Sequence, residues 1–203
     1  MENYQSTRKG VASIMHVYKY KNYDEYVAAQ TRTNKQKLDW VYVRRDVIEQ
    51  ISRDKQTADN IICHGTRSGA EQKYFKEFFP NASYIIGTEI SSTALSFPMT
   101  VQHDFTIQKP EWVKRFDIVY SNSFDHTMDP EKTMSVWAEQ LNDTGKLYLE
   151  YAESQSIGND ADPLHATNAE IQQLISRYLD VTGIITNNVK HGGVVFVCER
   201  NAK

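Results

Sequence analysis

One segment constrains the fold more than any other: an apolar run that leads directly into a glycine-bearing turn. Residues Ile61–His64 indicate a buried strand, and the turn that follows carries Gly65 and Gly69. Glu89 stands twenty positions after Gly69, at the end of a second apolar run. An α/β sheet that binds a nucleoside has this order: a strand, a tight turn, a helix start, and an acid at the end of the next strand. The spacing therefore predicts that Glu89 accepts hydrogen bonds from ribose hydroxyl groups.

The same turn limits which nucleoside ligand fits. Arg67 occupies the place of the middle glycine in the three-glycine phosphate fingerprint. A bulky cation there argues against a pyrophosphate lying flat on the helix N-terminus, although it does not preclude an anion. A ribose-bearing ligand without a pyrophosphate fits better, and the pattern favours S-adenosyl-L-methionine. A nicotinamide-dependent oxidoreductase, which would also use the acid on ribose, stays open as an alternative.

Composition restricts the class of protein. The 203 residues suit one domain whose interior is large enough for a sheet covered on both faces. The net charge of −3 gives no strong attraction to nucleic acid, and no apolar run approaches the roughly twenty residues of a membrane span. The first residues do not look like a secretory signal. We therefore expect a cytoplasmic protein with a small-molecule substrate and neither a nucleic-acid nor a membrane partner.

The cysteine and histidine residues bear on redox chemistry and metals. Cys63 and Cys198 each lie in a segment predicted to be a strand, where a buried thiol acts as a small hydrophobic group. The His and Asp residues do not cluster at ligand spacing along the sequence. We therefore expect neither a disulfide framework nor a metal site.

The hydrophobic pattern divides the chain into an N-terminal part, residues 1–58, and a core, residues 59–203. The N-terminal part is expected to be an arm followed by one or two helices between Asp24 and about Asp54. These helices would cover the core, either over the sheet edge or over the ligand mouth, with an apolar stripe at helical spacing. The stripe consists of Trp40, Val41, Val43, Val47, Ile48 and Ile51.

In the core, strand and helix patterns alternate. The predicted strands are Ile61–His64, Ser83–Glu89, Thr100–Asp104, Phe116–Ser121 and Lys146–Tyr151. The predicted helices are Gly69–Phe79, one that begins at Pro130, and one that follows a capping box at Thr167. The final strands, Gly183–Val189 and Val194–Glu199, indicate a hairpin about a glycine turn. This order predicts an α/β, Rossmann-like three-layer sandwich with a mostly parallel seven-stranded sheet and a terminal antiparallel β-hairpin.

The order of elements and the residues at the strand ends resemble the class I S-adenosylmethionine-dependent methyltransferases, from about residue 60 to 199. The resemblance is carried by the segments His64–Gly69, Gly87–Ser91, Gln102–Phe105, Phe116–His126 and Asn142–Leu147. The N-terminal helical part and the stretch Asp162–Leu164 are similar to a subgroup of small bacterial and viral methyltransferases. The family pattern has an acidic residue where this chain has Cys63.

By position, the resemblance implies that the turn and the end of the fourth strand hold the methionine part of S-adenosyl-L-methionine. The turn contributes His64, Gly65, Thr66, Arg67 and Gly69. The methyl group to be transferred would lie beside Ser121 and Asn122. For several of these residues a purely structural role stays open as the alternative. The glycines serve any tight turn, His64 is expected to pack or hydrogen-bond locally, and Arg67 either holds the cofactor carboxylate or pairs with Glu71.

The resemblance also implies contacts to the nucleoside part of the cofactor. Glu89 would bind both ribose hydroxyl groups, and Ile90 would pack on the adenine. Asp104 would accept a hydrogen bond from the adenine amino group, with Phe105 beside the ring. A strand-end cap is the competing interpretation of Asp104.

The chemistry of methyl transfer from a sulfonium needs a positioned acceptor, and a base where the attacking atom carries a proton. His126 is the candidate base, because imidazole titrates near neutral pH, and Asp125 would orient it or bind a substrate hydroxyl. A histidine that only satisfies backbone groups is the competing interpretation. The long polar connection 152–166 is expected to act as a lid. It carries a second candidate base, His165, and Tyr20 or Tyr23 would line the mouth.

The residues after the fourth strand bear on which molecule accepts the methyl group. The Asn-Pro-Pro-aromatic tetrad that grips a flipped base in nucleic-acid amine methylases does not occur there. The predicted function is an S-adenosyl-L-methionine-dependent methyltransferase that acts on a small polar acceptor by O- or N-methylation, such as a sugar derivative or another metabolite. The alternatives are the oxidoreductase named above and a catalytically silent subunit that binds S-adenosyl-L-methionine.

Overall fold

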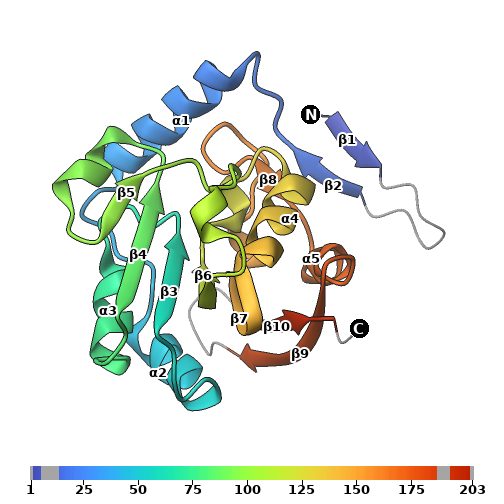
Figure 1. The fold of residues 1–203 in the computed structure, drawn as a ribbon. Coiled ribbons are helices and arrows are strands. Elements are labelled where there is room, and N and C mark those ends of the chain that lie inside the picture. The colour runs from blue at the N-terminus through green and yellow to red at the C-terminus, as the bar shows by residue number, and fades with distance from the viewer. Residues whose placement is uncertain (1, 6–13, 187–192, 202–203) are drawn as a thin grey trace.

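A central sheet of seven strands organises the molecule (Figure 1). The computed structural model describes residues 2–5, 14–186 and 193–201. The strands are β3 (Asn60–His64), β4 (Tyr84–Glu89), β5 (Thr100–Gln102), β6 (Phe116–Ser121), β7 (Leu141–Tyr151), β9 (Leu179–Thr186) and β10 (Val194–Arg200). Their order is β5-β4-β3-β6-β7-β10-β9; β5 to β7 are parallel, and β10 is antiparallel to both of its neighbours. The predicted sheet and its antiparallel final strands are confirmed, whereas the expected glycine turn between them begins outside the described residues.

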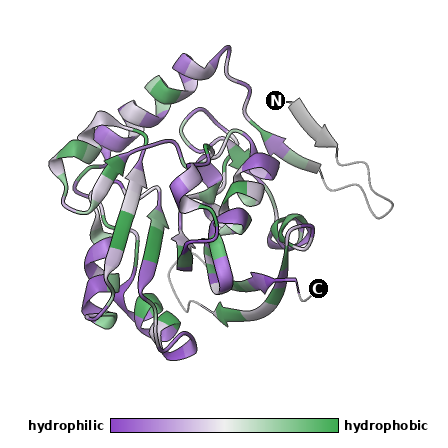
Figure 2. Cartoon of the chain, viewed as in Figure 1, coloured by the Kyte–Doolittle hydropathy of each residue, from purple (hydrophilic) through white to green (hydrophobic). Residues whose placement is uncertain are grey.

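Helices cover both faces of the sheet. Helices α2 (Arg45–Asp54) and α3 (Ala70–Phe78) lie on one face, and α4 (Pro130–Gln140) and α5 (Asn168–Ile175) on the other. Successive strand residues point to opposite faces: Ile61 packs in the cluster of α2 and α3, and Ile62 in the cluster of α4 and α5. In Figure 2 the strands β3 and β4 each contain a green block, and α2 and α3 alternate between green and purple. The three-layer prediction is therefore confirmed.

The side of the sheet on which successive strands are added switches at β3, and this switch positions a crevice. From β3 the chain adds β4 and β5 on one side, and it then returns to add β6 and β7 on the other. In open α/β sheets, ligands bind beyond the carboxyl ends of the strands at such a reversal. The residues directly after β3, β4 and β6 are therefore the ones that reach a common site.

The N-terminal part contains two helices, as expected, but the predicted stripe is only partly right. Helix α1 (Tyr23–Gln36) is capped by Asn22, whose side chain accepts from the backbone N–H of Glu25. Val43 and the apolar residues of α2 are buried. Trp40 and Val41 lie in the non-helical stretch between the helices, and their exposed fractions are 58% and 55%. Their apolar surface therefore faces outward from the core.

Two strand boundaries differ from the predictions. Strand β5 ends at Gln102, so Asp104 follows the strand rather than ending it. Strand β7 begins at Leu141, because the expected turn at 142–145 is a bulge within the strand. Leu141 pairs with Phe116, and Lys146 pairs with Ile118, so three extra residues of β7 are accommodated there. The capping box at Thr167 and the proline start of α4 are confirmed.

A small second sheet and four short 3₁₀ helices complete the described fold. The small sheet contains β1 (Glu2–Gln5), β2 (Ile14–Val17) and β8 (Leu164–His165), and its strands are antiparallel. The 3₁₀ helices are η1 (Ser92–Ser96), η2 (Pro110–Trp112), η3 (Phe124–His126) and η4 (Glu153–Gln155). Among the described residues, no helix combines the length and the apolar character that crossing a bilayer requires.

Candidate functional site

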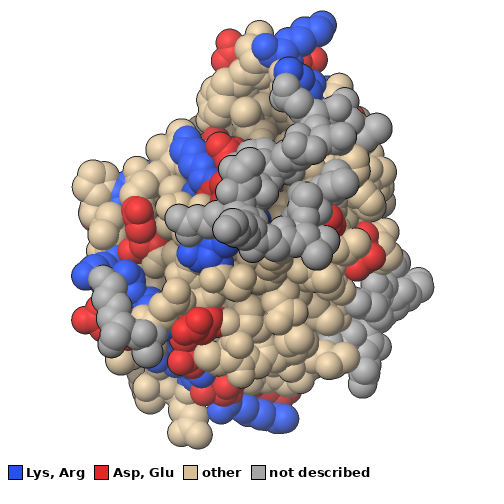
Figure 3. Space-filling view, turned by 90° about the vertical axis from the view of Figure 1, so that its right-hand side faces the viewer, with Lys and Arg blue, Asp and Glu red and all other residues tan. Residues whose placement is uncertain are grey.

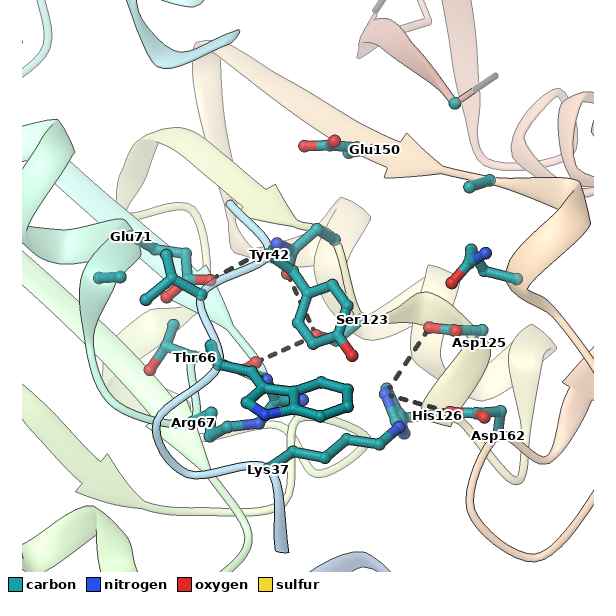
Figure 4. A pocket seen from close by; sticks show the side chains of 18 of the residues that line it. Lys37, Tyr42, Thr66, Arg67, Glu71, Ser123, Asp125, His126, Glu150 and Asp162 are labelled. Atoms are coloured by element: carbon teal, nitrogen blue, oxygen red, sulfur yellow. Dashed lines mark hydrogen bonds and ion pairs between the residues drawn. The ribbon is translucent and has the colours of Figure 1, made fainter. Parts of the chain in front are cut away.

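A cleft with two adjoining pockets lies at the carboxyl ends of the strands (Figure 4). The large pocket has a volume of about 260 Å³, and the small pocket one of about 40 Å³. Gly65, Arg67, Ser123 and His126 line both pockets, so the two are parts of one cleft. Most of the predicted site residues belong to this cleft.

The turn after β3 requires glycine for two separate reasons. Gly65 has a φ of +73°, which favours glycine, and a Cβ atom there would lie 2.5 Å from the Cβ of Ser123. Its backbone N–H donates to the carbonyl oxygen of Thr88 at 2.9 Å, which ties the turn to β4. Gly69 has a φ of +77° and is the N-cap residue of α3. The turn thus brings backbone next to the end of β6 with no side chain between them.

Arg67 adopts a left-handed conformation that is unusual for a residue with a side chain. Its φ is +42°, and such strain costs of order 1–3 kcal/mol. Its guanidinium donates to the carbonyl oxygen of Trp40 at 3.2 Å and lies 5.0 Å from the ring centre of Tyr42. Arg67 therefore anchors the exposed stretch 37–44 over the large pocket, whereas the predicted ion pair with Glu71 is not formed.

Glu89 presents a carboxylate whose orientation is fixed by backbone groups. It is buried at the end of β4 and lines the small pocket with Ile90. Oε1 accepts from the N–H of Ser91 at 2.8 Å, and Oε2 accepts from the N–H of Arg67 at 3.2 Å. Each carboxylate oxygen has a second lone pair. Glu89 is therefore held in one position and can still accept hydrogen bonds from a ligand.

Asp104 and Phe105 form the opposite wall of the small pocket. Oδ1 of Asp104 accepts from the N–H of Thr106 at 2.8 Å, the capping role considered for it. Oδ2 accepts from the hydroxyl of Tyr23 at 2.9 Å. Burial, and then the hydrogen bond to Asp104, raise the pKa of Tyr23 to about 12. The capping role therefore leaves Oδ2 for a second partner, which is a tyrosine of α1.

Two predicted cofactor residues lie behind the cleft instead of in its wall. His64 is fully buried, stacks on Trp137 and lines neither pocket. Its Nε2–H donates to Gln140, and burial lowers its pKa to about 3. The hydroxyl of Ser121 donates to the carbonyl oxygen of His64 and accepts from the N–H of Ser123. The local interpretation of His64 thus agrees with the structure, and the large pocket is lined by Asn122 and Ser123 rather than by the side chains of His64 and Ser121.

The candidate base His126 lies where the two pockets meet. Its Nδ1 is 2.9 Å from the carbonyl oxygen of Ala161 and 3.0 Å from Oε1 of Gln30. Both neighbours are acceptors, so Nδ1 carries the proton in the neutral ring. Nε2 is 3.6 Å from a carboxylate oxygen of Asp162 and 4.0 Å from one of Asp125. Figure 4 shows the three side chains converging at one side of the pocket.

This convergence corrects the expectation that His and Asp residues do not cluster. The ligand atoms of Asp125, His126 and Asp162 all lie within 4.8 Å of one another, an arrangement that could hold a metal ion. Burial raises the pKa of Asp125, and the charge of Asp162 adds to the effect, whereas His126 lowers it. Asp162 escaped the prediction because it lies 36 positions from His126 in the sequence.

The remaining secondary candidates do not line the cleft. His165 hydrogen-bonds through Nδ1 to the carbonyl oxygen of Ser156 and lines neither pocket. Tyr20 donates to the carbonyl oxygen of Asp160, and Tyr23 reaches the cleft only through Asp104. The connection 152–166 contributes Ala152, Gln155, Ile157 and Asp162 to the large pocket.

Sequence reasoning missed one wall of each pocket. Helix α1 lines the small pocket with Tyr26, Gln30, Thr33 and Asn34. The large pocket has two further carboxylates, Glu71 and Glu150, at the side away from His126 in Figure 4. The start of α3 at the glycine turn was visible in the sequence, but the inward direction of Glu71 was not.

Comparison with known proteins gives a consistent result for the fold. Neither a family model nor a curated protein matches the sequence. The 1,6-didemethyltoxoflavin-N1-methyltransferase of Burkholderia thailandensis, solved with 1,6-didemethyltoxoflavin and S-adenosylhomocysteine, has a TM-score of 0.69 at 12% identity over 100% of each chain. An N-methyltransferase of Bradyrhizobium japonicum WM9, solved with S-adenosylhomocysteine, has a TM-score of 0.67 at 10% identity over 86% of this chain and 100% of that chain. A geranyl diphosphate C-methyltransferase of Streptomyces coelicolor A3(2), solved with Mg²⁺, geranyl diphosphate and S-adenosylhomocysteine, has a TM-score of 0.62 at 11% identity over 77% of each chain.

The chain has the fold of the class I S-adenosylmethionine-dependent methyltransferases, and the resemblance seen in the sequence is confirmed at the level of the fold. The three similar proteins are named as N- and C-methyltransferases. The fold therefore leaves the acceptor atom open, and the residues of the cleft have to be considered for it.

Proposed function

We propose that this protein is an S-adenosyl-L-methionine-dependent methyltransferase that acts on a small polar acceptor by O- or N-methylation. One observation carries the proposal. Glu89 is a buried carboxylate, fixed by two backbone N–H groups, beside a turn that tolerates no Cβ atom. A hydrogen-bond acceptor held in this way suits a ribose diol, because it lies where the strand order of a parallel sheet reverses.

The small pocket would receive the nucleoside. Glu89 would accept from the ribose hydroxyl groups, Ile90 and Phe105 would pack on the adenine, and Asp104 would accept from its amino group. At about 40 Å³ the pocket is too small for a nucleoside, since ligand sites usually measure about 300–1,000 Å³. Binding therefore requires α1 to move outward and Tyr23 to release Asp104.

The amino-acid end of the cofactor and the acceptor would share the large pocket. Gly65, Thr66 and Arg67 line it on one side, and Asn122 lines it on another. A methyl group directed toward Asn122 and Ser123 would lie within the same pocket as His126. The stretch 37–44 covers this pocket with exposed apolar side chains, which would exclude water once a ligand is bound.

His126 suits the role of base. With the proton on Nδ1, the lone pair of Nε2 faces the pocket and can take a proton from a hydroxyl or an ammonium group. The acceptor oxygen or nitrogen then forms a bond to the methyl carbon, and the bond from that carbon to sulfur breaks with its electron pair left on sulfur. The carboxylates of Asp125 and Asp162 would stabilise the imidazolium that forms.

The described residues on the face shown in Figure 3 give no support for a nucleic-acid substrate. On the face shown in Figure 3, blue and red side chains are interspersed among neutral ones, and the described residues form no continuous basic band there. Nucleic-acid binding relies on such bands. This agrees with the proposed small-molecule acceptor.

Titration calorimetry with S-adenosylhomocysteine and with NADH tests the proposal. We expect the first to bind and the second not to bind. Glu89→Ala should weaken binding of S-adenosylhomocysteine by about 1–3 kcal/mol, because buried donors lose a charged partner. Glu111→Ala, an exposed acid outside the cleft, is the control. Binding of NADH alone would favour the oxidoreductase, and binding of S-adenosylhomocysteine without turnover on any acceptor would favour the silent subunit.

A further inference from the structure

Glu71 is a buried acid that no interaction in the described fold explains. It lies in the first turn of α3, two residues after Gly69, and is only 6% exposed. Its Oε1 has one long contact, 3.5 Å from Nδ2 of Asn122. Its Oε2 has no hydrogen-bond partner among the described residues. Glu71 lines the large pocket, so the open oxygen belongs to a group in the wall of a ligand site.

The surroundings of Glu71 do not supply a counter-charge. The charge of Arg67 acts on Glu71 and lowers its pKa, but that guanidinium is engaged by the carbonyl oxygen of Trp40 and the ring of Tyr42. Glu150, a second acid in the same pocket, repels it and accepts from the hydroxyl of Tyr120. Burial raises the pKa of Glu71 to about 8. A carboxyl group in such a place stays neutral or binds a cation.

We infer that Glu71 binds an ammonium group of a ligand in the large pocket. An ammonium group has three donors and no acceptor, and it would satisfy Oε2 while Asn122 keeps Oε1. Binding converts the carboxylic acid to a carboxylate and releases its proton to solvent. The charge-assisted hydrogen bond that results is stronger than one between neutral groups.

Within the proposed function, two ligands could supply this group. One is the amino-acid end of the cofactor, because Glu71 follows the turn that would hold that end. The other is an acceptor that is an amine, because Glu71 and Asn122 line the pocket in which the methyl group would be transferred. The chemistry is the same in both cases, and the two sources can be separated by experiment.

The first arm of the experiment compares S-adenosylhomocysteine with 5′-methylthioadenosine, which shares the nucleoside and the thioether but lacks the amino-acid end. Affinities are measured by calorimetry for the full chain and for Glu71→Gln, which keeps the shape of the side chain. If the cofactor supplies the ammonium group, the substitution weakens the binding of S-adenosylhomocysteine at least tenfold and that of 5′-methylthioadenosine less than twofold. Glu77→Gln, an exposed acid of the same helix, should change neither.

The second arm uses glucosamine and glucose as probes, with S-adenosylhomocysteine at saturation. They differ by an ammonium group in place of one hydroxyl. If the acceptor supplies the group, the unchanged protein prefers glucosamine at least tenfold and Glu71→Gln loses that preference. The inference is overturned if Glu71→Gln changes neither the affinity for S-adenosylhomocysteine nor the preference for glucosamine. Failure of the proposed function looks different, because the unchanged protein would then either not bind S-adenosylhomocysteine or bind it without turnover on any acceptor.

Discussion

The buried Glu71 should make the protein less stable as the pH rises from 6.5 to 8.0. Its pKa is about 8 in the folded protein against an ordinary value of 4.5, so between these values the folded state holds a proton that the unfolded state has lost. Stability then falls with pH by about 1.4 kcal/mol per unit. Over the window from 6.5 to 8.0 the loss from Glu71 is about 1.6 kcal/mol, because the slope halves as the pH reaches the folded-state pKa.

The window is chosen because of His64. Its pKa is about 3 in the folded protein against an ordinary 6.5, so below pH 6.5 the unfolded state binds an extra proton and stability rises with pH. Between pH 4.5 and 6.5 the effects of His64 and Glu71 oppose each other and nearly cancel. Above pH 6.5 His64 adds only about 0.4 kcal/mol more, because its imidazole is already half deprotonated in the unfolded state, and Glu71 dominates.

Urea unfolding followed by tryptophan fluorescence at pH 6.5 and 8.0 measures the effect. The unchanged protein and Glu77→Gln should lose about 1.2 kcal/mol over this range, whereas Glu71→Gln should lose none, because glutamine does not titrate. Glu71→Gln should also fold at pH 7, where the acid it replaces is neutral in the empty pocket. An equal pH dependence in the unchanged protein and Glu71→Gln would refute this account of the buried acid.

Three further predictions concern the turn, the base and the role of metals. Gly65→Ala should destabilise the protein by about 1–3 kcal/mol in thermal unfolding, because of its positive φ and the contact with Ser123, whereas Gly183→Ala, whose Cβ would lie 3.7 Å from its nearest neighbour, should cost less. His126→Gln should lower kcat by a factor of about 10²–10⁴ with an identified acceptor while S-adenosylhomocysteine still binds; full turnover would exclude His126 as the base. EDTA should leave turnover unchanged; a loss that Mg²⁺ restores would make the Asp–His–Asp cluster a set of metal ligands instead.

The sequence predicted the parts of the site that are local. The strand, the turn and the start of α3 follow one another within a few residues, so apolar period and glycine spacing are enough to locate Gly65 and Gly69. Glu89 could be predicted for the same reason, since β4 is the next strand and its last residue must reach the same edge. Trp40 was misplaced because an apolar residue at helical spacing indicates a buried face, and here the helix pattern breaks between α1 and α2.

The contacts that were missed join distant parts of the chain. Gln30 meets His126 across 96 positions, and Tyr23 meets Asp104 across 81. No periodicity encodes such pairs, because they depend on where α1 crosses the carboxyl ends of the strands. The direction of Glu71 depends in the same way on how α3 packs beside β6.

The cleft does not follow the predicted division of the chain at residue 58, which stays a prediction about organisation. Helix α1 forms one wall of the small pocket, and the stretch 37–44 covers the large one. The same helix holds the candidate base, since Gln30 accepts from Nδ1 of His126 and Tyr26 donates to its carbonyl oxygen. An outward movement of α1 that admits a nucleoside therefore changes the hydrogen bonds of His126, so opening of the small pocket and the position of the base are linked through one helix.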